Sequence, residues 1–168
     1  MKDYPAALTN FLGVVQARPD YVFVSGTFRE GIWTYVGRAY YGLSRFSEAQ
    51  QSFERALVPD KNDFLAQIYL GLTVARDNHS APGLQKIETG LKGLLRWIEH
   101  ANSVNASAAL WDPRAEIRRE IEKNLALISS HAADMQKVIE AGEWIGERIE
   151  NEVEQVRADE SRRFNDEY

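Results

Sequence analysis

The chain has 168 residues and a formal net charge of −5, with 44% hydrophobic and 27% charged residues, which is typical of a globular domain. It contains no cysteine, which excludes disulfides, thiolate catalysis and cysteine-based zinc sites. No apolar run approaches the roughly 20 residues that are needed to cross a bilayer, so we expect no insertion into a membrane.

The negative charge is concentrated at one end of the chain. Residues 134–168 contain eleven acidic and five basic residues, whereas the residues before them are close to neutral. A nucleic-acid-binding protein usually has a basic face, and the sequence predicts none. We therefore expect no nucleic-acid partner.

The first predicted element is a helix over residues 2–19, with Ala7, Phe11 and Val14 on one side. Residues 21–28, YVFVSGTF, begin with strand-forming side chains. One isolated strand would have nothing to pair with, so we interpret this segment as an apolar loop that packs across the first helices. The helical pattern is expected to resume at Arg29.

Residues 31–60 carry the most regular pattern in the chain. Large aromatic residues are spaced to fill the angle between two helices, and small residues would let those helices approach closely. The break is GLSR at residues 42–45, and Ser47 can cap the second helix. The positions that make up the pattern are Trp33, Val36, Gly37, Tyr40, Ala49, Phe53, Ala56 and Pro59.

This spacing resembles the tetratricopeptide repeat, W-x2-L-G-x2-Y followed by A-x3-F and P. The resemblance covers residues 1–101, as a half repeat at 2–19, a repeat at 30–63 and a degenerate repeat at 64–101. It implies an all-α fold, a right-handed superhelix of antiparallel helix pairs followed by two longer C-terminal helices. A half repeat leaves an apolar face uncovered, so either the natural protein continues upstream of Met1 or the lone helix is a cap.

After the central pair, helices are predicted at residues 62–77 and from residue 80 to about 101. The second has a long apolar stripe. Residues 102–111 are interpreted as a loop, and Asp112 as the N-cap of a helix that runs to Ser129 and covers the end of the repeats. The residues of the stripe are Leu84, Ile87, Leu91, Leu94 and Ile98.

The last predicted helix runs from about residue 131 to 163. It is grouped with the preceding helix as a C-terminal unit, residues 112–163, and residues 164–168 are expected to fray. Its apolar seam must be covered by something, and we expect the first half to pack on the preceding helix and the second half on another copy of the chain. The seam comprises Met135, Val138, Ile139, Ile145, Ile149, Val153 and Val156, joined by Trp144. The positions assigned to a possible dimer interface are Val138, Ile145, Ile149 and Val156.

The resemblance also implies a binding surface, the concave face that the first helix of each repeat lines. The chaperone-adaptor version of that surface needs lysine and asparagine at the places of Thr34 and Arg38, which argues against such a ligand here. An apolar peptide or helix of a partner fits the groove, and so does the chain's own C-terminal helix. The predicted groove residues are Thr34, Arg38, Tyr41, Leu65, Ile68, Leu72 and Arg76.

A run of carboxylates at helical spacing stands on the last helix. The simple interpretation is a solvated face, and the more specific one is a docking surface for a basic partner or a divalent cation. The three histidines, at residues 79, 100 and 131, have no ligand spacing, so we expect neither a metal site nor a cofactor. The carboxylates in question are Glu143, Glu147, Glu150 and Glu154.

No phosphate-binding loop, nucleophile elbow or dinucleotide-binding motif occurs in the sequence. The function that the resemblance implies is non-catalytic, a protein–protein interaction module that binds a peptide or helix in the groove. Two alternatives stay open. The chain could be a homodimerising structural domain, or a regulatory part of a larger enzyme or secretion protein.

Overall fold

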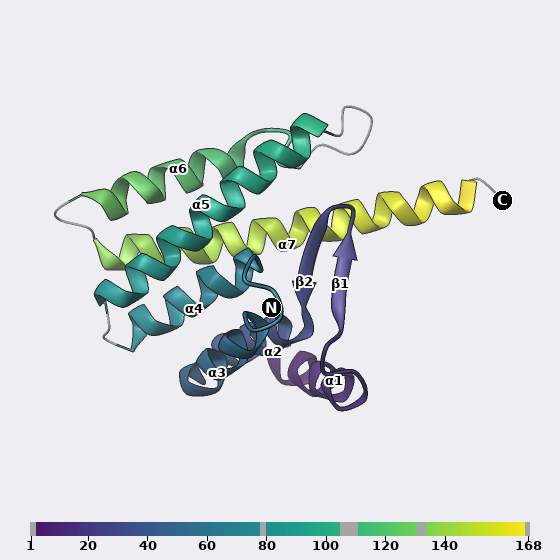
Figure 1. Cartoon of the computed structure of the whole chain (residues 1–168), viewed down its shortest axis with the longest axis horizontal. Coiled ribbons are helices and arrows are strands. Elements are labelled where there is room, and N and C mark those ends of the chain that lie inside the picture. The colour runs from purple at the N-terminus through teal and green to yellow at the C-terminus, as the bar shows by residue number, and fades with distance from the viewer. Residues whose placement is uncertain (1–2, 78–79, 105–110, 131–133, 167–168) are drawn as a thin grey trace.

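The computed structural model describes residues 3–77, 80–104, 111–130 and 134–166. Helices dominate this part of the chain, which confirms the predicted all-α character, but a two-stranded sheet accompanies them (Figure 1). The helices are α1 Tyr4–Ala17, α2 Ile32–Gly42, α3 Phe46–Ala56, α4 Phe64–Arg76, α5 Ser80–Val104, α6 Glu116–Ser129 and α7 Met135–Asp166. The strands are β1 Val22–Ser25 and β2 Phe28–Gly31.

The interpretation of residues 21–28 as a loop was wrong, because β1 has a partner. It pairs with β2 in an antiparallel hairpin whose register runs from Val22 opposite Gly31 to Ser25 opposite Phe28. Gly26, with a φ of 55°, allows the two-residue turn. The helix therefore begins at Ile32 and not at Arg29.

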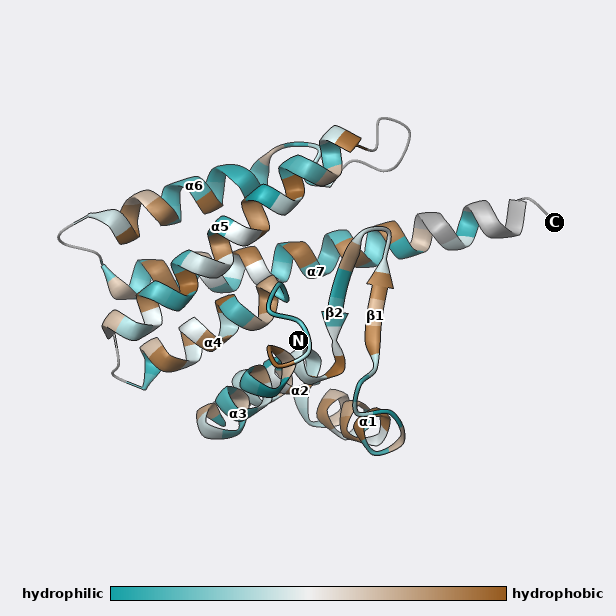
Figure 2. Cartoon of the chain, viewed as in Figure 1, coloured by the Kyte–Doolittle hydropathy of each residue, from teal (hydrophilic) through white to brown (hydrophobic). Residues whose placement is uncertain are grey.

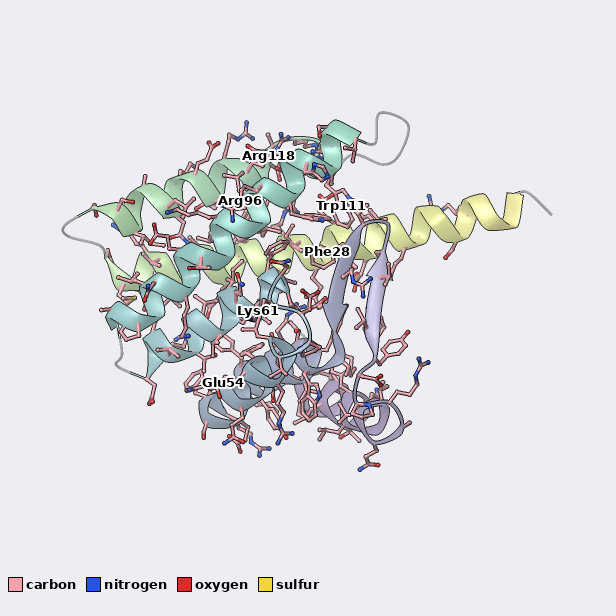
Figure 3. The ribbon with its side chains drawn as sticks, viewed as in Figure 1. Phe28, Glu54, Lys61, Arg96, Trp111 and Arg118 are labelled. Carbon is pink, nitrogen blue, oxygen red and sulfur yellow. The ribbon has the colours of Figure 1, made fainter. Side chains whose placement is uncertain are left out.

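The hairpin also packs against α5 and against the segment that precedes α6. Phe28 is 4% exposed, and its ring centroid lies 5.1 Å from that of Trp97 and 5.7 Å from that of Trp111. Phe28 and Trp111 are labelled where they meet in Figure 3. A residue from an expected loop is thus part of the main core.

Helices α2 and α3 form the predicted central pair, and a glycine sets their separation. A Cβ atom on Gly37 would lie 2.5 Å from the ring of Phe53, so only glycine allows this approach. Helix α3 begins at Phe46 with Arg45 as its N-cap, and Ser47 lies inside the first turn rather than capping it. Phe53 is fully buried, whereas Trp33 and Tyr40 are half-buried at the edges of the core.

Helices α4 and α5 are antiparallel and in close contact. Gly90 faces Ile68, Gly71 faces Ile87 and Gly83 faces Ala75. The residue numbers increase along α4 while they decrease along α5, as expected for antiparallel helices. The predicted stripe on α5 is buried, except that Leu84 is half-buried. Helix α5 continues to Val104, so residues 102–104 are helical where a loop was expected, and residues 105–110 of that loop lie outside the described part.

Asp112 caps α6 from outside the helix. The prediction placed it at the N-cap, but the N-cap is Ala115, with a φ of 55°, and the helix begins at Glu116. The Asp112 carboxylate still accepts hydrogen bonds from the backbone N–H groups of Ile117 and Arg118, each at 3.0 Å. Asp112 therefore caps the backbone N–H groups of α6 as expected, although a turn of chain separates it from the start of the helix.

Helix α7 packs along α4 and α6, so most of its seam is covered by its own chain. Val138, Ile145 and Ile149 are 0% exposed and Val156 is half-buried. The chain itself covers Val138, Ile145 and Ile149, so the proposed dimer interface was wrong for these three residues, whereas Val156 keeps part of its surface exposed. Trp144 is not buried in the seam; it is 39% exposed and lines a pocket between α6 and α7.

Figure 2 shows hydrophobic residues distributed along all the helices and along β1. Two buried clusters result. The larger joins α3 to α7, and a smaller one, around Leu8, Val36 and Ala39, joins α1 to α2. Among the described residues, no helix combines the length and the apolar composition that crossing a membrane requires. The C-terminal part of α7 extends past the hairpin (Figure 1).

Candidate binding site between helices α2 and α7

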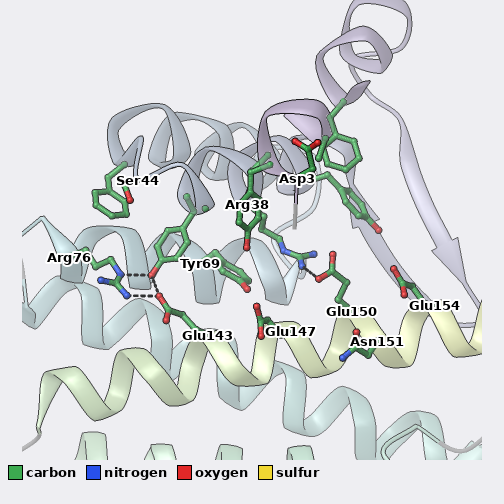
Figure 4. A pocket seen from close by; sticks show the side chains of 18 residues that line it. Asp3, Arg38, Ser44, Tyr69, Arg76, Glu143, Glu147, Glu150, Asn151 and Glu154 are labelled. Atoms are coloured by element: carbon green, nitrogen blue, oxygen red, sulfur yellow. Dashed lines mark hydrogen bonds and ion pairs between the residues drawn. The ribbon is translucent and has the colours of Figure 1, made fainter. Parts of the chain in front are cut away.

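A pocket of about 630 Å³ lies where α7 crosses α1, α2, the start of α3 and the end of α4 (Figure 4). All four carboxylates of the run on α7 line it. The facing walls supply tyrosine rings and two arginines. The lining residues used below are Tyr35, Arg38, Tyr41, Tyr69 and Arg76 from the walls, with Asp3 at the rim.

At one end of the pocket, Glu143 is held by two side chains. The Tyr41 hydroxyl donates a hydrogen bond to Glu143 Oε1 at 2.5 Å, and Arg76 Nη2 lies 2.6 Å from the same oxygen. Arg76 Nε in turn donates to the Tyr41 hydroxyl at 2.6 Å. Burial, together with the hydrogen bond to Glu143, raises the pKa of Tyr41 above its ordinary value, so the phenol keeps the proton that it donates.

Arg38 fixes the middle of α7 to α2. Its Nη1 lies 3.2 Å from Glu30 Oε1, and its Nη2 lies 2.6 Å from Glu150 Oε2. The guanidinium also stands over the rings of Tyr69, at 5.3 Å, and Tyr35, at 5.9 Å. Figure 4 shows the Arg38 side chain reaching toward Glu150 across the pocket.

Behind Arg38 lies a buried carboxylate. The Glu30 side chain is 3% exposed, and desolvation by burial raises its pKa to about 7, against the attraction of Arg38, which lowers it. The buried carboxylate of Asp63 adds to the rise. Burial and the neighbouring Glu30 raise the pKa of Tyr35 as well. Glu30 therefore binds a proton at a higher pH than an exposed glutamate does.

The titration of Glu30 should make stability depend on pH. Its pKa is 4.5 in the unfolded chain and about 7 in the folded one, so between these values the folded state binds more protons. Stability is then highest below about pH 4.5 for this group and falls as the pH rises toward about 7. At about 1.4 kcal/mol per pKa unit, the loss is about 3 kcal/mol.

Urea denaturation of wild type and Glu30→Gln at about pH 5 and about pH 8 measures this effect. The difference in unfolding free energy between the two proteins should change with pH, because only the wild type contains Glu30. Other titrating groups, such as Asp63, are present in both proteins. Equal pH dependence in the two proteins would contradict the assignment.

The structure brings together three of the seven predicted groove residues. Arg38, Tyr41 and Arg76 line the pocket. Thr34, Leu65, Ile68 and Leu72 are 0% exposed and cannot touch a partner. Different elements cover these residues: Ile68 packs against Gly90 of α5, and Leu72 lies against α7. Gly142 of α7 rests on Leu72.

The carboxylate run on α7 is not the simple solvated face. Glu143 and Glu150 are engaged by Arg76 and Arg38, while Glu147 and Glu154 are exposed at the opening. The helical spacing of these four carboxylates was what marked them in the sequence as a candidate surface. Nothing in the sequence marked Tyr35 or Tyr69 as part of the site.

The described residues form no candidate metal centre. Among the described residues, no three or more histidine, aspartate or glutamate side chains are placed to hold a metal ion. His100 is exposed, and residues 79 and 131 lie outside the described part. Comparison with protein-family models, with curated proteins and with solved structures finds no match to this chain.

Proposed function

We propose that the protein is a non-catalytic interaction module that binds a peptide segment of a partner in the pocket between α2 and α7. The observation that carries the proposal is the pocket itself, a concave site of about 630 Å³ with aromatic walls and convergent charged groups. Ligand sites in proteins have this size and this mixture of apolar surface and a few placed polar groups.

The resemblance of residues 31–60 to a tetratricopeptide repeat supports the same class of function. Such repeats present a concave face to a peptide. Here α7 occupies much of that face, because Gly142 and Gly146 let its backbone rest on Leu72 and Tyr69. A whole helix of a partner no longer fits, so the ligand is a short segment that enters the remaining opening.

The state of the inner carboxylates suits binding better than acid–base catalysis. Glu143 and Glu150 each lie 2.6 Å from an arginine nitrogen, which fixes the position of both side chains. Their role is to position α7 and to shape the pocket. The exposed groups at the opening, among them Asn151 and Glu154, are the ones that a ligand meets first.

An unbiased peptide selection tests this function. Peptides are selected from a random library on the wild-type protein, and their affinities are then measured for Asn151→Arg. Asn151 is exposed on α7 and lines the pocket, so a long cationic side chain there should fill the opening and weaken binding by about tenfold or more. The matched control is Gln155→Arg, which makes the same change at an exposed position of the same helix outside the lining.

Peptides that bind the control like wild type but lose affinity for Asn151→Arg support the proposal. If no peptide is enriched, or if the selected peptides bind all three proteins equally, the pocket is not the binding site. Circular dichroism of each variant shows that it is folded.

A further inference from the structure

We propose that α1 is a movable wall of this pocket: it detaches from α2 as one unit, while the rest of the molecule stays folded, and so widens the opening for a ligand. The role of this movement in binding rests on the proposed function, whereas the detachment itself does not. Three observations carry it: the small buried contact of α1, the firm attachment of the other walls, and an exposed connection that can act as a hinge.

Helix α1 is held by little buried surface. Leu8 is the one buried residue among its 14, whereas nine of the 13 residues of α4 are buried. Leu8 belongs to the smaller cluster with Val36 and Ala39. Among the described helices and strands, α2 is the only one on which α1 packs extensively, and Figure 1 shows α1 at the edge of the molecule. Elements with few buried apolar contacts are the ones that open locally in native proteins.

The other walls of the pocket are fastened more firmly. Helix α7 is tied to α2 by Arg38, which lies 2.6 Å from Glu150, and to α4 by Arg76, which lies 2.6 Å from Glu143. Helices α3, α4 and α7 also share the main buried cluster, to which α1 contributes no residue. Of the elements that line the pocket, α1 is therefore the one that can leave with the smallest loss of buried contact.

The connection from α1 to β1 can serve as the hinge. Residues 18–20 are exposed. Tyr21, which follows them, is fixed to the start of α2, because its carbonyl accepts a hydrogen bond from the Ile32 N–H at 2.8 Å. A movement of α1 can therefore end at Tyr21 and leave the hairpin in place. A helix of 14 residues is marginal on its own in water, so the detached segment loses its helical hydrogen bonds.

The detachment of α1 changes the pocket directly, because α1 and its N-cap form one side of it. When α1 leaves α2, the pocket is open on this side and a peptide segment can enter. A ligand that contacts these residues then favours the docked state of α1, so the helix closes on the ligand. The residues of this side are Asp3, Tyr4, Ala7 and Phe11.

Native-state hydrogen exchange, followed by NMR, tests the detachment without a ligand. In the wild type, the amides of residues 8–14 should share one protection factor, at least about a hundredfold below that of α4, and should respond to low urea concentrations far less than the amides of α4 do. Protection that falls gradually toward the start of α1 would show fraying of a helix end. Protection equal to that of α4 would show unfolding of the whole molecule. Either result would overturn the proposal.

Two variants separate α1 from the core. Leu8→Ala should lower the protection of all these α1 amides by the same factor, at least about tenfold, because alanine keeps the helix propensity and removes the contact with α2. The control, Ile98→Val, shortens a side chain of the main core that is 0% exposed. It should lower the protection of α4 about two- to tenfold and leave that of α1 unchanged. An equal fall in α1 and α4 for Ile98→Val would mean that α1 opens only together with the core.

A peptide from the library selection tests the role in binding. At about 100 times its dissociation constant, it should raise the protection of α1 by at least about tenfold, since α1 has to close on it. A peptide that depends on Asn151 but leaves the protection of α1 unchanged would keep the proposed function and overturn the role of α1 in binding. If no peptide is selected, the proposed function fails, and the exchange of the free protein still decides whether α1 detaches.

Discussion

Phe53→Ala should lower the free energy of unfolding by about 3–5 kcal/mol, as aromatic truncations in protein cores do. Phe53 is 0% exposed, its ring covers Gly37, and it stacks on Tyr69 with centroids 5.9 Å apart. Alanine would leave a cavity where α2, α3 and α4 meet. Urea denaturation measures the loss of stability. The control is Val58→Ala, at a nearby position in the sequence where the side chain is 80% exposed, and it should change stability by less than about 0.5 kcal/mol.

A double-mutant cycle makes this prediction specific to the Gly37–Phe53 contact. Gly37→Ala alone should destabilise the protein, because its Cβ would meet the Phe53 ring at 2.5 Å. In the Phe53→Ala background the added methyl group has room, and the cost should largely disappear. Strictly additive effects would show that the two residues do not touch.

Arg38→Met should cost about 3–5 kcal/mol at about pH 8, because it removes one partner of a buried ion pair. Glu30 is 3% exposed and would be left with its charge unpaired, and Glu150 would lose its contact with α2. The cost should shrink toward about pH 5, because burial raises the pKa of Glu30 and loss of Arg38 removes the charge that lowers it, so that Glu30 is protonated there.

Two comparisons test the role of Arg38. Arg45→Met removes an arginine from the exposed pair with Glu48, whose side chains are 49% and 40% exposed, and should cost far less than Arg38→Met. Adding Glu30→Gln to Arg38→Met should recover part of the loss, because no buried charge is then left alone. A loss for Arg38→Met no larger than that for Arg45→Met would show that the buried pair is not important for stability.

The helices could be predicted from the sequence because their signals are local. The stripe on α5 repeats at helical spacing within one short stretch, and Gly37 and Gly71, which face Phe53 and Ile87, each lie within a helical pattern of their own. The hairpin was missed because its second strand, which contains Arg29 and Glu30, lacks the apolar composition of the first. Its stability comes partly from Phe28, which packs between tryptophans about 70–80 residues away in the chain.

The candidate site could be predicted only in part. The sequence analysis identified the carboxylates of α7 and the groove arginines as separate candidates. No pattern within either segment indicated that they bind each other. Tyr41 and Glu143 are 102 positions apart. Asp63 is similar: it caps α4 as composition suggests, yet it also accepts hydrogen bonds from Gly31 and Thr34, and a buried carboxylate with distant donors leaves no mark in the sequence.

The contact of α7 with α4 has a consequence for synthesis of the chain on the ribosome. Leu72 and Tyr69 on α4 are covered by Gly142 and Gly146, which are made about 70 residues later. At about 5–20 residues per second, α4 waits roughly 4–15 s for its cover. During that interval the apolar face of α4 in the nascent chain stays uncovered. The protein therefore completes its fold only when its last helix has left the exit tunnel.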